Sequence, residues 1–399
     1  MARLIGTVSR GIRAPIFREG DDVVKMTGDA VLAALKEHGI EPQDKDVVAV
    51  TESVVARCQG NYATIDQIAK DVREKTGGGT VGLTFPIMSR NRFSLLLRGI
   101  ARGCKKVVVM MSYPTDEVGN QLLTEEMLEE SGLNPYTDVL DVAAFRKHFG
   151  VWLHPFTGMD YISFYTDLIE GQGAQAEIIF SNRIQTILDY TDTVICCDIH
   201  TRFRNKKKLQ DAGAKTVLDL TDILNAPVDG SGYNPNYGLL GSNKSDEGRV
   251  KLFPRDCMEV AHGISAYLSE KTGKHIEAMV YGDGAFKDPA CKIWELADPV
   301  VSPGYTDGLK GTPNELKLNY LADDTFSDLK GEELKAAISQ RIREKDASVS
   351  LVGNMVSEGT TPRNLTDLIG SLCDLTSGSG DKGTPIVYLQ GYFDNSTND

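Results

Sequence analysis

Apolar residues recur along much of the chain at the spacing of helices. The first clear case is a helix predicted over residues 22–38, which Gly39 ends. Asp21 lies just before this segment and is the expected cap, so Asp21 and Asp22 are interpreted as capping residues rather than as ligands. The apolar stripe of this helix consists of Val24, Val31 and Leu35.

Short apolar runs alternate with these helices and predict buried strands. The alternation favours an α/β fold with mixed α+β layers. Residues 192–220 are the clearest strand–helix–strand unit, whereas residues 226–248 form a long, turn-rich loop. Further helices are expected at about residues 64–75, 93–103, 331–345 and from Thr361 with Pro362 in the first turn. Further strands are expected at about residues 46–50, 83–87, 105–114, 275–284 and 384–393.

Composition narrows the class of protein. The chain of 399 residues is 41% hydrophobic and 25% charged, as in globular proteins, and no apolar run approaches the ~20 residues of a membrane helix. The first residues lack an apolar segment of signal-peptide length, and the seven cysteines show no Cys-x-x-Cys spacing. A cytoplasmic protein is therefore expected. A net charge of −13 argues against nucleic-acid partners, and no membrane partner is expected.

Aspartates follow several predicted strands. Asp116, Asp198 and Asp283 each come at or just after such a strand, and ligands of α/β sheets collect beyond the carboxyl ends of strands. Mg²⁺ binds one or two carboxylates together with substrate phosphates, so the set predicts a metal–nucleotide site. No Gly-x-x-x-x-Gly-Lys-Ser/Thr motif is present, so such a site would lack a P-loop. Each aspartate taken alone is equally compatible with a turn or a helix cap.

Several other residues of reactive or charged type each have a purely structural alternative. Asp198 and His200 alternate on a predicted strand and could share a Mn²⁺ or Zn²⁺ ion, although a hydrogen-bonded histidine at a strand end is the alternative. Cys196 and Cys197 are interpreted as strand packing rather than as nucleophiles. The basic cluster of residues 202–208 is interpreted as a solvated helix face.

Two stretches carry a resemblance to a known family. Residues 11–22, "GIRAPIFREGDD", are similar to a Gly-Ile-Pro-like strand followed by Gly-Asp-Asp, and residues 46–51, "DVVAVT", to the Asp-Val-Val-Val-Val-Thr strand that comes next. Residues 365–391 resemble the terminal helix, loop and strand of the same family. The chain thus resembles the coenzyme F420-0:L-glutamate ligases, which extend the tail of a deazaflavin cofactor.

The resemblance implies a fold and a set of site residues. The expected fold is a ligase-like core formed by residues 1–125 and 271–399, with residues 126–270 as a large central insertion or second subdomain, in a homodimer. Arg13 and Arg57 would be catalytic, and Asp116 and Asp283 would hold Mg²⁺ or Mn²⁺; Gly284 replaces the hydroxyl residue that follows the second aspartate in the family. The nucleotide would contact Gly11, Ile12, Arg13, Ala14, Pro15, Ser53, Arg57 and Asn120.

The resemblance also implies a reaction. GTP would phosphorylate the carboxylate of F420-0 or of a related small anionic acceptor, and the amine of L-glutamate would then attack the acyl phosphate. Two alternatives stay open from the residues: a metal-dependent nucleotide phosphohydrolase or phosphotransferase, and a non-catalytic binding protein with the same fold. The replacement by Gly284 and the unusual central segment keep the non-catalytic binding protein in consideration.

Overall fold

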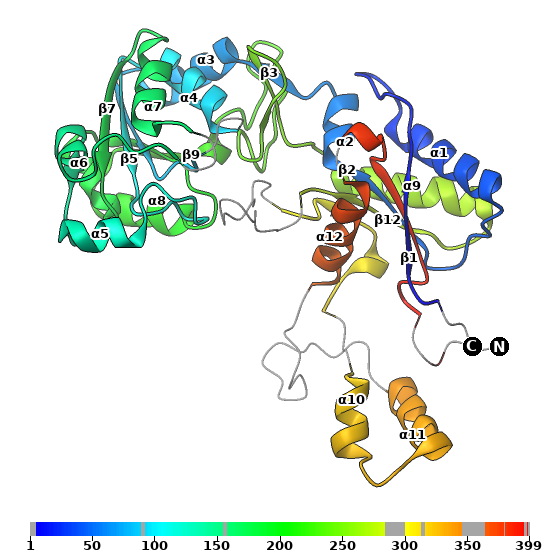
Figure 1. The fold of residues 1–399 in the computed structure, drawn as a ribbon. Coiled ribbons are helices and arrows are strands. Elements are labelled where there is room, and N and C mark those ends of the chain that lie inside the picture. Colours follow the sequence, from blue (N-terminus) through cyan, green and yellow to red (C-terminus); the bar gives the residue numbers. More distant parts are fainter. Residues whose placement is uncertain are drawn as a thin grey trace. The chain divides into compact units, whose positions relative to one another are not determined.

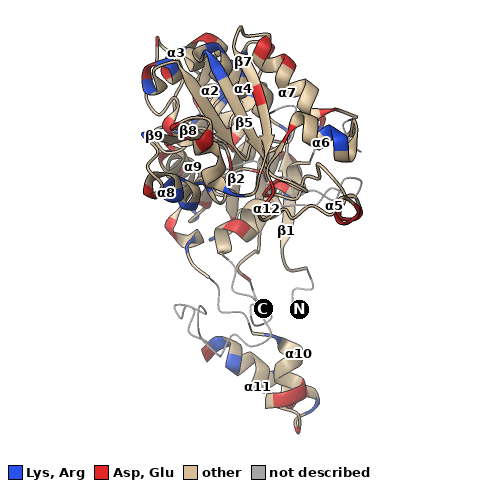
Figure 2. Cartoon of the chain, turned by 90° about the vertical axis from the view of Figure 1, so that its left-hand side faces the viewer, with Lys and Arg blue, Asp and Glu red and all other residues tan. Residues whose placement is uncertain are grey.

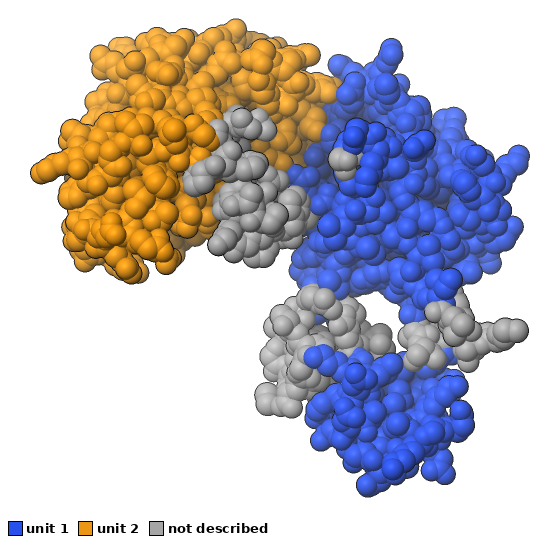
Figure 3. Space-filling view, viewed as in Figure 1, with its two compact units in different colours: residues 1–58, 256–284, 300–399 blue, residues 59–255, 285–299 orange. Residues whose placement is uncertain are grey.

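A computed structural model describes residues 5–88, 92–154, 158–283, 300–312, 316–344, 364–378, 380–394 and 397. The chain divides into two units, which are coloured separately in Figure 3. Unit 1 consists of Met1–Cys58, Asp256–Gly284 and Val300–Asp399, and unit 2 of Gln59–Arg255 and Ala285–Pro299.

Unit 1 is built on one mixed sheet with the strand order β1-β14-β2-β12-β13 (Figure 1). Its strands are β1 (Val8–Ile12), β2 (Val47–Thr51), β12 (Glu277–Tyr281), β13 (Gly304–Tyr305) and β14 (Ile386–Gln390). Its helices are α1 (Val23–His38), α2 (Glu52–Cys58), α9 (Cys257–Thr272), α10 (Leu318–Tyr320), α11 (Gly331–Glu344) and α12 (Leu365–Ser377).

Helices cover both faces of the unit 1 sheet. Alternate residues of a strand point to opposite faces, so Val48 and Val50 of β2 pack with α1 and α9. Val47 and Ala49 of the same strand pack with α12 on the other face. Both faces are therefore buried, which explains why β2 reads as a continuous apolar run.

Unit 2 holds a larger sheet with the order β6-β7-β5-β4-β8-β9 and a small sheet with the order β10-β11-β3 (Figure 1). The strands are β3 (Tyr62–Thr64), β4 (Thr80–Thr84), β5 (Lys106–Met111), β6 (Leu140–Asp141), β7 (Gln175–Phe180), β8 (Thr193–Cys196), β9 (Thr216–Asp219), β10 (Asn243–Lys244) and β11 (Arg249–Lys251). The helices are α3 (Ile65–Thr76), α4 (Phe93–Gly103), α5 (Glu125–Ser131), α6 (Val142–Phe149), α7 (Tyr161–Glu170) and α8 (Arg202–Asp211).

The larger sheet of unit 2 is doubly wound. β7, β5, β4, β8 and β9 are all parallel, and only the edge strand β6 is antiparallel. The chain starts at β4, moves outward through β5 to β7, and then returns to the other side of β4 for β8 and β9. The winding direction therefore reverses between β4 and β8, as at the switch point of dinucleotide-binding sheets.

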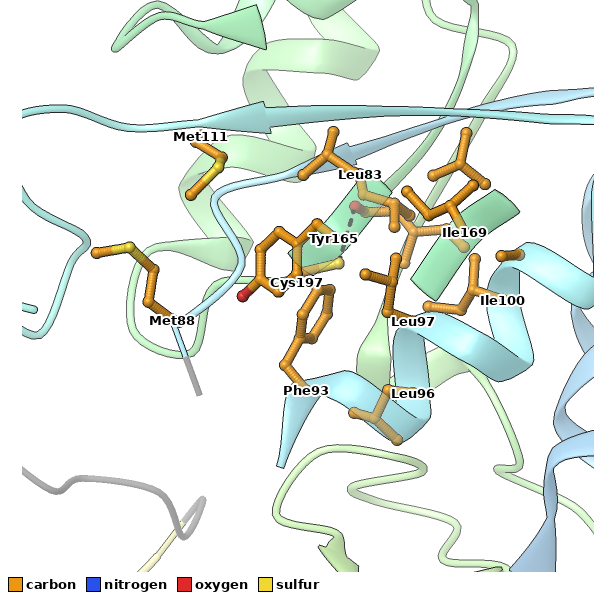
Figure 4. Packing of buried hydrophobic residues seen from close by; sticks show 14 of the residues in the cluster. Leu83, Met88, Phe93, Leu96, Leu97, Ile100, Met111, Tyr165, Ile169 and Cys197 are labelled. Atoms are coloured by element: carbon orange, nitrogen blue, oxygen red, sulfur yellow. Dashed lines mark hydrogen bonds between the residues drawn. The ribbon is translucent and has the colours of Figure 1, made fainter. Parts of the chain in front are cut away.

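Helices α3, α4 and α7 bury one face of this sheet. Figure 4 shows Leu83 of β4, Phe93 and Leu97 of α4, and Tyr165 of α7 turned toward one another. The rings of Phe93 and Tyr165 meet edge to face, with centroids 5.8 Å apart. Cys197 lies in this core, whereas Cys196 packs on the opposite face with α8, so both thiols are packing groups as the sequence predicted.

The α/β fold class is confirmed, and the predicted strand–helix–strand unit is present as β8, α8 and β9. Several local predictions were wrong, among them the strand at about residues 83–87, because β4 spans Thr80–Thr84. Asp22, not Asp21, is the N-cap of α1, because its carboxylate accepts the backbone N–H of Lys25. Strand β8 ends at Cys196, earlier than predicted, because the chain there turns toward α8. Thr361 and Pro362 lie outside the described residues, and α12 begins at Leu365 after Asn364.

The division into units differs from the predicted domain limits. Residues 59–125, assigned from the sequence to the ligase-like core, supply β4 and β5 at the centre of the unit 2 sheet. Residues 256–270, assigned to the insertion, belong to α9 of unit 1. In both cases long-range strand pairing and packing decide which unit a segment joins.

Candidate functional site

Three strands of unit 1 end at the same edge of its sheet. β12 runs parallel to β2 with Tyr281 beside Thr51. β14 is antiparallel to both β2 and β1, so β1 runs in the same direction as β2. The segments that follow β1, β2 and β12 therefore leave the sheet at one edge, which we call the unit 1 strand-end edge.

The segment after β1 carries the first group of predicted nucleotide contacts. Gly11 and Ile12 are the last residues of β1, and the backbone N–H of Ala14 donates to the carbonyl of Gly383 at 3.2 Å. The side chains of Arg13 and Pro15 are exposed. A Cβ on Gly11 would lie 3.1 Å from Cβ of Thr384, so a larger residue would press on the start of β14.

Helix α2 carries the second group. It begins directly after β2, with Ser53 in its first turn and Arg57 in its last turn, and Arg57 is exposed. Among the described residues, the side chains of Arg13 and Arg57 have no hydrogen-bond or ion-pair partner, so both guanidinium groups are available to an anion. Glu52, which was not singled out from the sequence, is 5% exposed at this edge. Its position directly after a buried strand was the available signal.

Asp283 is the carboxylate of this edge. It follows the end of β12 by two residues and is half-buried. The hydroxyl of Tyr281 donates to the carbonyl of Pro385 at 3.3 Å and so ties β12 to the start of β14. The three segments that leave this edge carry Arg13, Arg57 and Asp283 and are far apart in the sequence.

Asp116 and Asn120 lie in unit 2, in the connection after β5. Oδ1 of Asp116 accepts the backbone N–H groups of Val118 at 3.1 Å and Asn120 at 2.7 Å. Oδ2 accepts the backbone N–H of Met88 at 3.1 Å and the side-chain amide of Asn120 at 2.6 Å. Burial raises the pKa of Asp116 to about 6, against the opposing effect of these bonds.

This geometry does not favour Asp116 as a metal ligand. An ionised carboxylate has about four lone-pair sites, and the four N–H donors occupy them. Asp116 holds its own loop, whereas Asp283 belongs to unit 1. The two aspartates that the resemblance paired therefore belong to different units. No group of three His, Cys, Asp or Glu side chains suited to a metal ion occurs within the described ranges.

Asp198 and His200 do not share a strand face, which corrects the reasoning that paired them. Both lie beyond the end of β8, in its connection to α8. Asp198 is fully buried, and its Oδ2 accepts the hydroxyl of Thr201 at 2.5 Å and the amide of Asn205 at 3.1 Å. Burial raises its pKa, with a further contribution from the charge of Glu117. The side chain of His200, by contrast, is exposed.

Glu117 is the residue of unit 2 that sequence reasoning missed. Its carboxylate accepts the backbone N–H groups of Ile199, His200 and Thr201, at 3.1 Å for His200 and 3.3 Å for Thr201. Ile199 and His200 are the two residues before the N-cap of α8, and Thr201 is that N-cap, whose N–H has no partner within the helix. No local pattern signals this contact, because 82 residues separate Glu117 from Ile199.

The basic cluster of residues 202–208 forms part of the surface of α8, where Figure 2 shows Lys and Arg in blue. Lys206 pairs with Asp222 at 2.6 Å and Lys207 with Asp211 at 3.1 Å. The interpretation as a charged helix face is therefore confirmed.

Burial raises the pKa of the Cys196 thiol to about 12, which agrees with a packing role.

A family model described as F420-0:Gamma-glutamyl ligase matches residues 11–391. The chain belongs to the F420-0:gamma-glutamyl ligase family. The match begins at Gly11, the first residue of the predicted nucleotide-contacting segment, and extends just past β14. No curated protein matches the chain. Membership of the F420-0:gamma-glutamyl ligase family supports a ligase with small-molecule substrates. None of the helices in the described part is long and apolar enough to cross a membrane.

Proposed function

We propose that this chain is a GTP- and divalent-metal-dependent γ-glutamyl ligase. It forms an amide between L-glutamate and an activated carboxylate of F420-0 or a related small anionic acceptor. The observation that carries the proposal is the unit 1 strand-end edge, from which the segments that carry Arg13, Arg57 and Asp283 leave the sheet in a chain of this family.

The two arginines supply the charge that a nucleotide needs. The phosphates of GTP carry several negative charges, and guanidinium groups bind phosphate with paired, charge-assisted hydrogen bonds. Arg13 and Arg57 are exposed on the segments that follow β1 and β2. Ser53 and the backbone of residues 11–15 complete the proposed contacts.

Asp283 is the proposed metal ligand in unit 1. A half-buried carboxylate beyond a strand end fits Mg²⁺ or Mn²⁺, which take the remaining ligands from water and phosphate oxygens. When bound, the ion would offset the charge that develops on the phosphates during transfer. The four donors on Asp116 leave no such position there, so the proposal places the metal on Asp283 alone.

The reaction proceeds in two balanced steps. The acceptor carboxylate attacks the γ-phosphorus of GTP, which yields an acyl phosphate and GDP. The amine of L-glutamate then attacks the acyl carbon, which releases phosphate and leaves the amide. Phosphoryl transfer of this kind depends mostly on positioning and on charge stabilisation, which Arg13 and Arg57 provide.

The test is a ligation assay with the full chain, GTP, Mg²⁺ or Mn²⁺, ¹⁵N-labelled L-glutamate and F420-0. Mass spectrometry should detect the labelled glutamyl product, with one GDP formed per amide. Arg13→Gln and Arg57→Gln should each lower kcat/KM by roughly 10- to 150-fold, which corresponds to one lost charged hydrogen bond of about 1.5–3 kcal/mol. The matched control is Arg343→Gln, an exposed arginine of α11.

The outcomes separate the candidate functions. GDP production that does not depend on glutamate would replace the ligase proposal with a nucleotide phosphohydrolase. A homodimer stays a prediction, which the molar mass from light scattering would check.

A further inference from the structure

The sheet of unit 2 has a feature that the proposed ligase reaction does not use. Its winding reverses between β4 and β8, so the connections that leave these two neighbouring strands turn to opposite faces of the sheet. In open α/β sheets, ligands bind in the crevice outside the carboxyl ends of the strands at this point. The segment after β8 is the one that contains Asp198.

Asp198 has an unused acceptor at this position. Its side chain is fully buried, and Oδ2 is satisfied by Thr201 and Asn205. Oδ1 is buried and has no hydrogen-bond partner among the described residues. A buried carboxylate oxygen without a hydrogen-bond donor lowers the stability of the fold. Because no described protein atom donates to this oxygen, a donor from a ligand would satisfy it.

A second unused acceptor lies in a neighbouring connection. Oδ1 of Asn120, in the segment after β5, is also buried without a hydrogen-bond partner in the described part of the chain. Asn120 is 4% exposed, and its amide nitrogen is fixed on Asp116. Because β5, β4 and β8 are parallel neighbours, both acceptors follow strands that end at the same edge of the sheet.

The same edge does not favour an anionic ligand. Glu117 reaches from the segment after β5 to the N–H groups of Ile199 and His200, just before α8, and of its N-cap Thr201, so a carboxylate already lies at the N-terminal end of α8, where an anion would otherwise be favoured. Asp198 adds a second carboxylate nearby, and its raised pKa reflects in part the charge of Glu117. The two unused acceptors, Oδ1 of Asp198 and Oδ1 of Asn120, need hydrogen-bond donors, and the nearby carboxylates repel an anion. The ligand that fits both conditions is neutral and donates hydrogen bonds.

We propose that the switch-point edge of unit 2 binds a ligand with vicinal hydroxyl groups, and that Asp198 accepts a hydrogen bond from one of them. The shared chemistry is that of the ribose of a nucleoside or of a free sugar. Carboxylates at strand ends of doubly wound sheets contact ribose hydroxyls in this way. The site lies within unit 2 and is independent of the ligase proposal for unit 1.

The first experiment uses the wild-type full chain and hydrogen exchange with mass spectrometry. Guanosine should slow amide exchange in residues 112–122 and 196–205, and 2′,3′-dideoxyguanosine should not, because it lacks both hydroxyl groups. Protection by D-glucose as well would identify a general sugar site, and protection by guanosine alone a nucleoside site. The proposal is overturned if neither guanosine nor glucose slows exchange there, or if the dideoxy form protects equally.

A variant then tests the named residue. Asp198→Asn keeps an oxygen for Thr201 and Asn205 and puts an N–H₂ donor where the unused oxygen was. Calorimetry should show binding of the protecting ligand weakened at least tenfold, as expected for the loss of one hydrogen bond to a charged group. Asp211→Asn, an exposed aspartate at the end of α8, should bind as wild type does. Wild-type affinity in Asp198→Asn would overturn the assignment, and the comparison of guanosine with its dideoxy form decides the proposal if that variant does not fold.

Discussion

Glu117→Ala offers a direct test of how the start of α8 is held. The carboxylate of Glu117 accepts the N–H groups of Ile199, His200 and Thr201, which have no partner within the helix. A hydrogen bond to a charged group contributes about 1.5–3 kcal/mol to stability. Because Glu117 is partly exposed, water can bond to the freed N–H groups in the variant and offset part of this lost free energy. A carboxylate at a helix start contributes up to ~2 kcal/mol by its charge alone. Together these give a loss of roughly 2–3 kcal/mol in the local stability of α8.

Hydrogen exchange with mass spectrometry measures this loss directly. A change of 2–3 kcal/mol in opening free energy should speed amide exchange in α8 by roughly 30- to 140-fold, with little change in α1 of the other unit. The matched control is Glu130→Ala, an exposed glutamate of α5, which should leave the exchange of α8 unchanged. An increase of less than about threefold in Glu117→Ala would refute the reasoning, because the bonds would then contribute almost nothing.

Three further predictions concern Asp116, Asp283 and Gly28. Folding raises the pKa of Asp116 from 3.8 to about 6, so the folded state binds the proton more tightly than the unfolded state. The free energy of unfolding should therefore fall by about 3 kcal/mol as pH rises from about 4 to about 6. Urea titrations that measure this free energy should show a weaker pH dependence in Asp116→Asn than in the wild type. Asp283→Asn should abolish the metal-dependent stabilisation by GTP, which in the wild type is roughly 2.7 kcal/mol at 100 times Kd; an unchanged thermal shift would exclude Asp283 as the metal ligand. Gly28→Ala should lower the free energy of unfolding by about 1–3 kcal/mol, because the new Cβ would lie 2.3 Å from Cδ1 of Tyr267. In the background of Tyr267→Ala, Gly28→Ala should lower it much less. Equal losses in the two backgrounds would contradict the steric explanation.

The local elements of the fold were largely predictable. The left-handed Gly39 ends α1 where the sequence placed a stop, and α4 spans Phe93–Gly103 as predicted. The continuous apolar run of β2 was correctly predicted to be a buried strand. Periodicity, capping and chain reversal depend on residues within a few positions of one another, so a single sequence contains the signal.

The candidate site was predictable only in part. The rule that ligands gather beyond strand ends drew attention to Asp283 after β12, and the resemblance drew attention to Arg13 and Arg57; all three stay predictions as site residues. The rule failed for Asp116, because one of its four donors is the N–H of Met88, which lies 28 residues earlier in the chain. The pairing of Asp198 with His200 failed because β8 ends at Cys196, before either residue.

The sequence alone therefore sufficed for the α/β class, the family and part of the helices and strands, but not for α7, α9 or β7. The tertiary structure decided which strands are neighbours. Only the pairing of β1, β14, β2 and β12 makes the segments that carry Arg13, Arg57 and Asp283 leave the sheet at one edge, and only the order β7-β5-β4-β8-β9 creates the switch point beside Asp198. Some of these neighbours, such as β4 and β8 or β2 and β12, are more than a hundred residues apart in the chain, and the local pattern of one strand contains no information about which neighbour it will have.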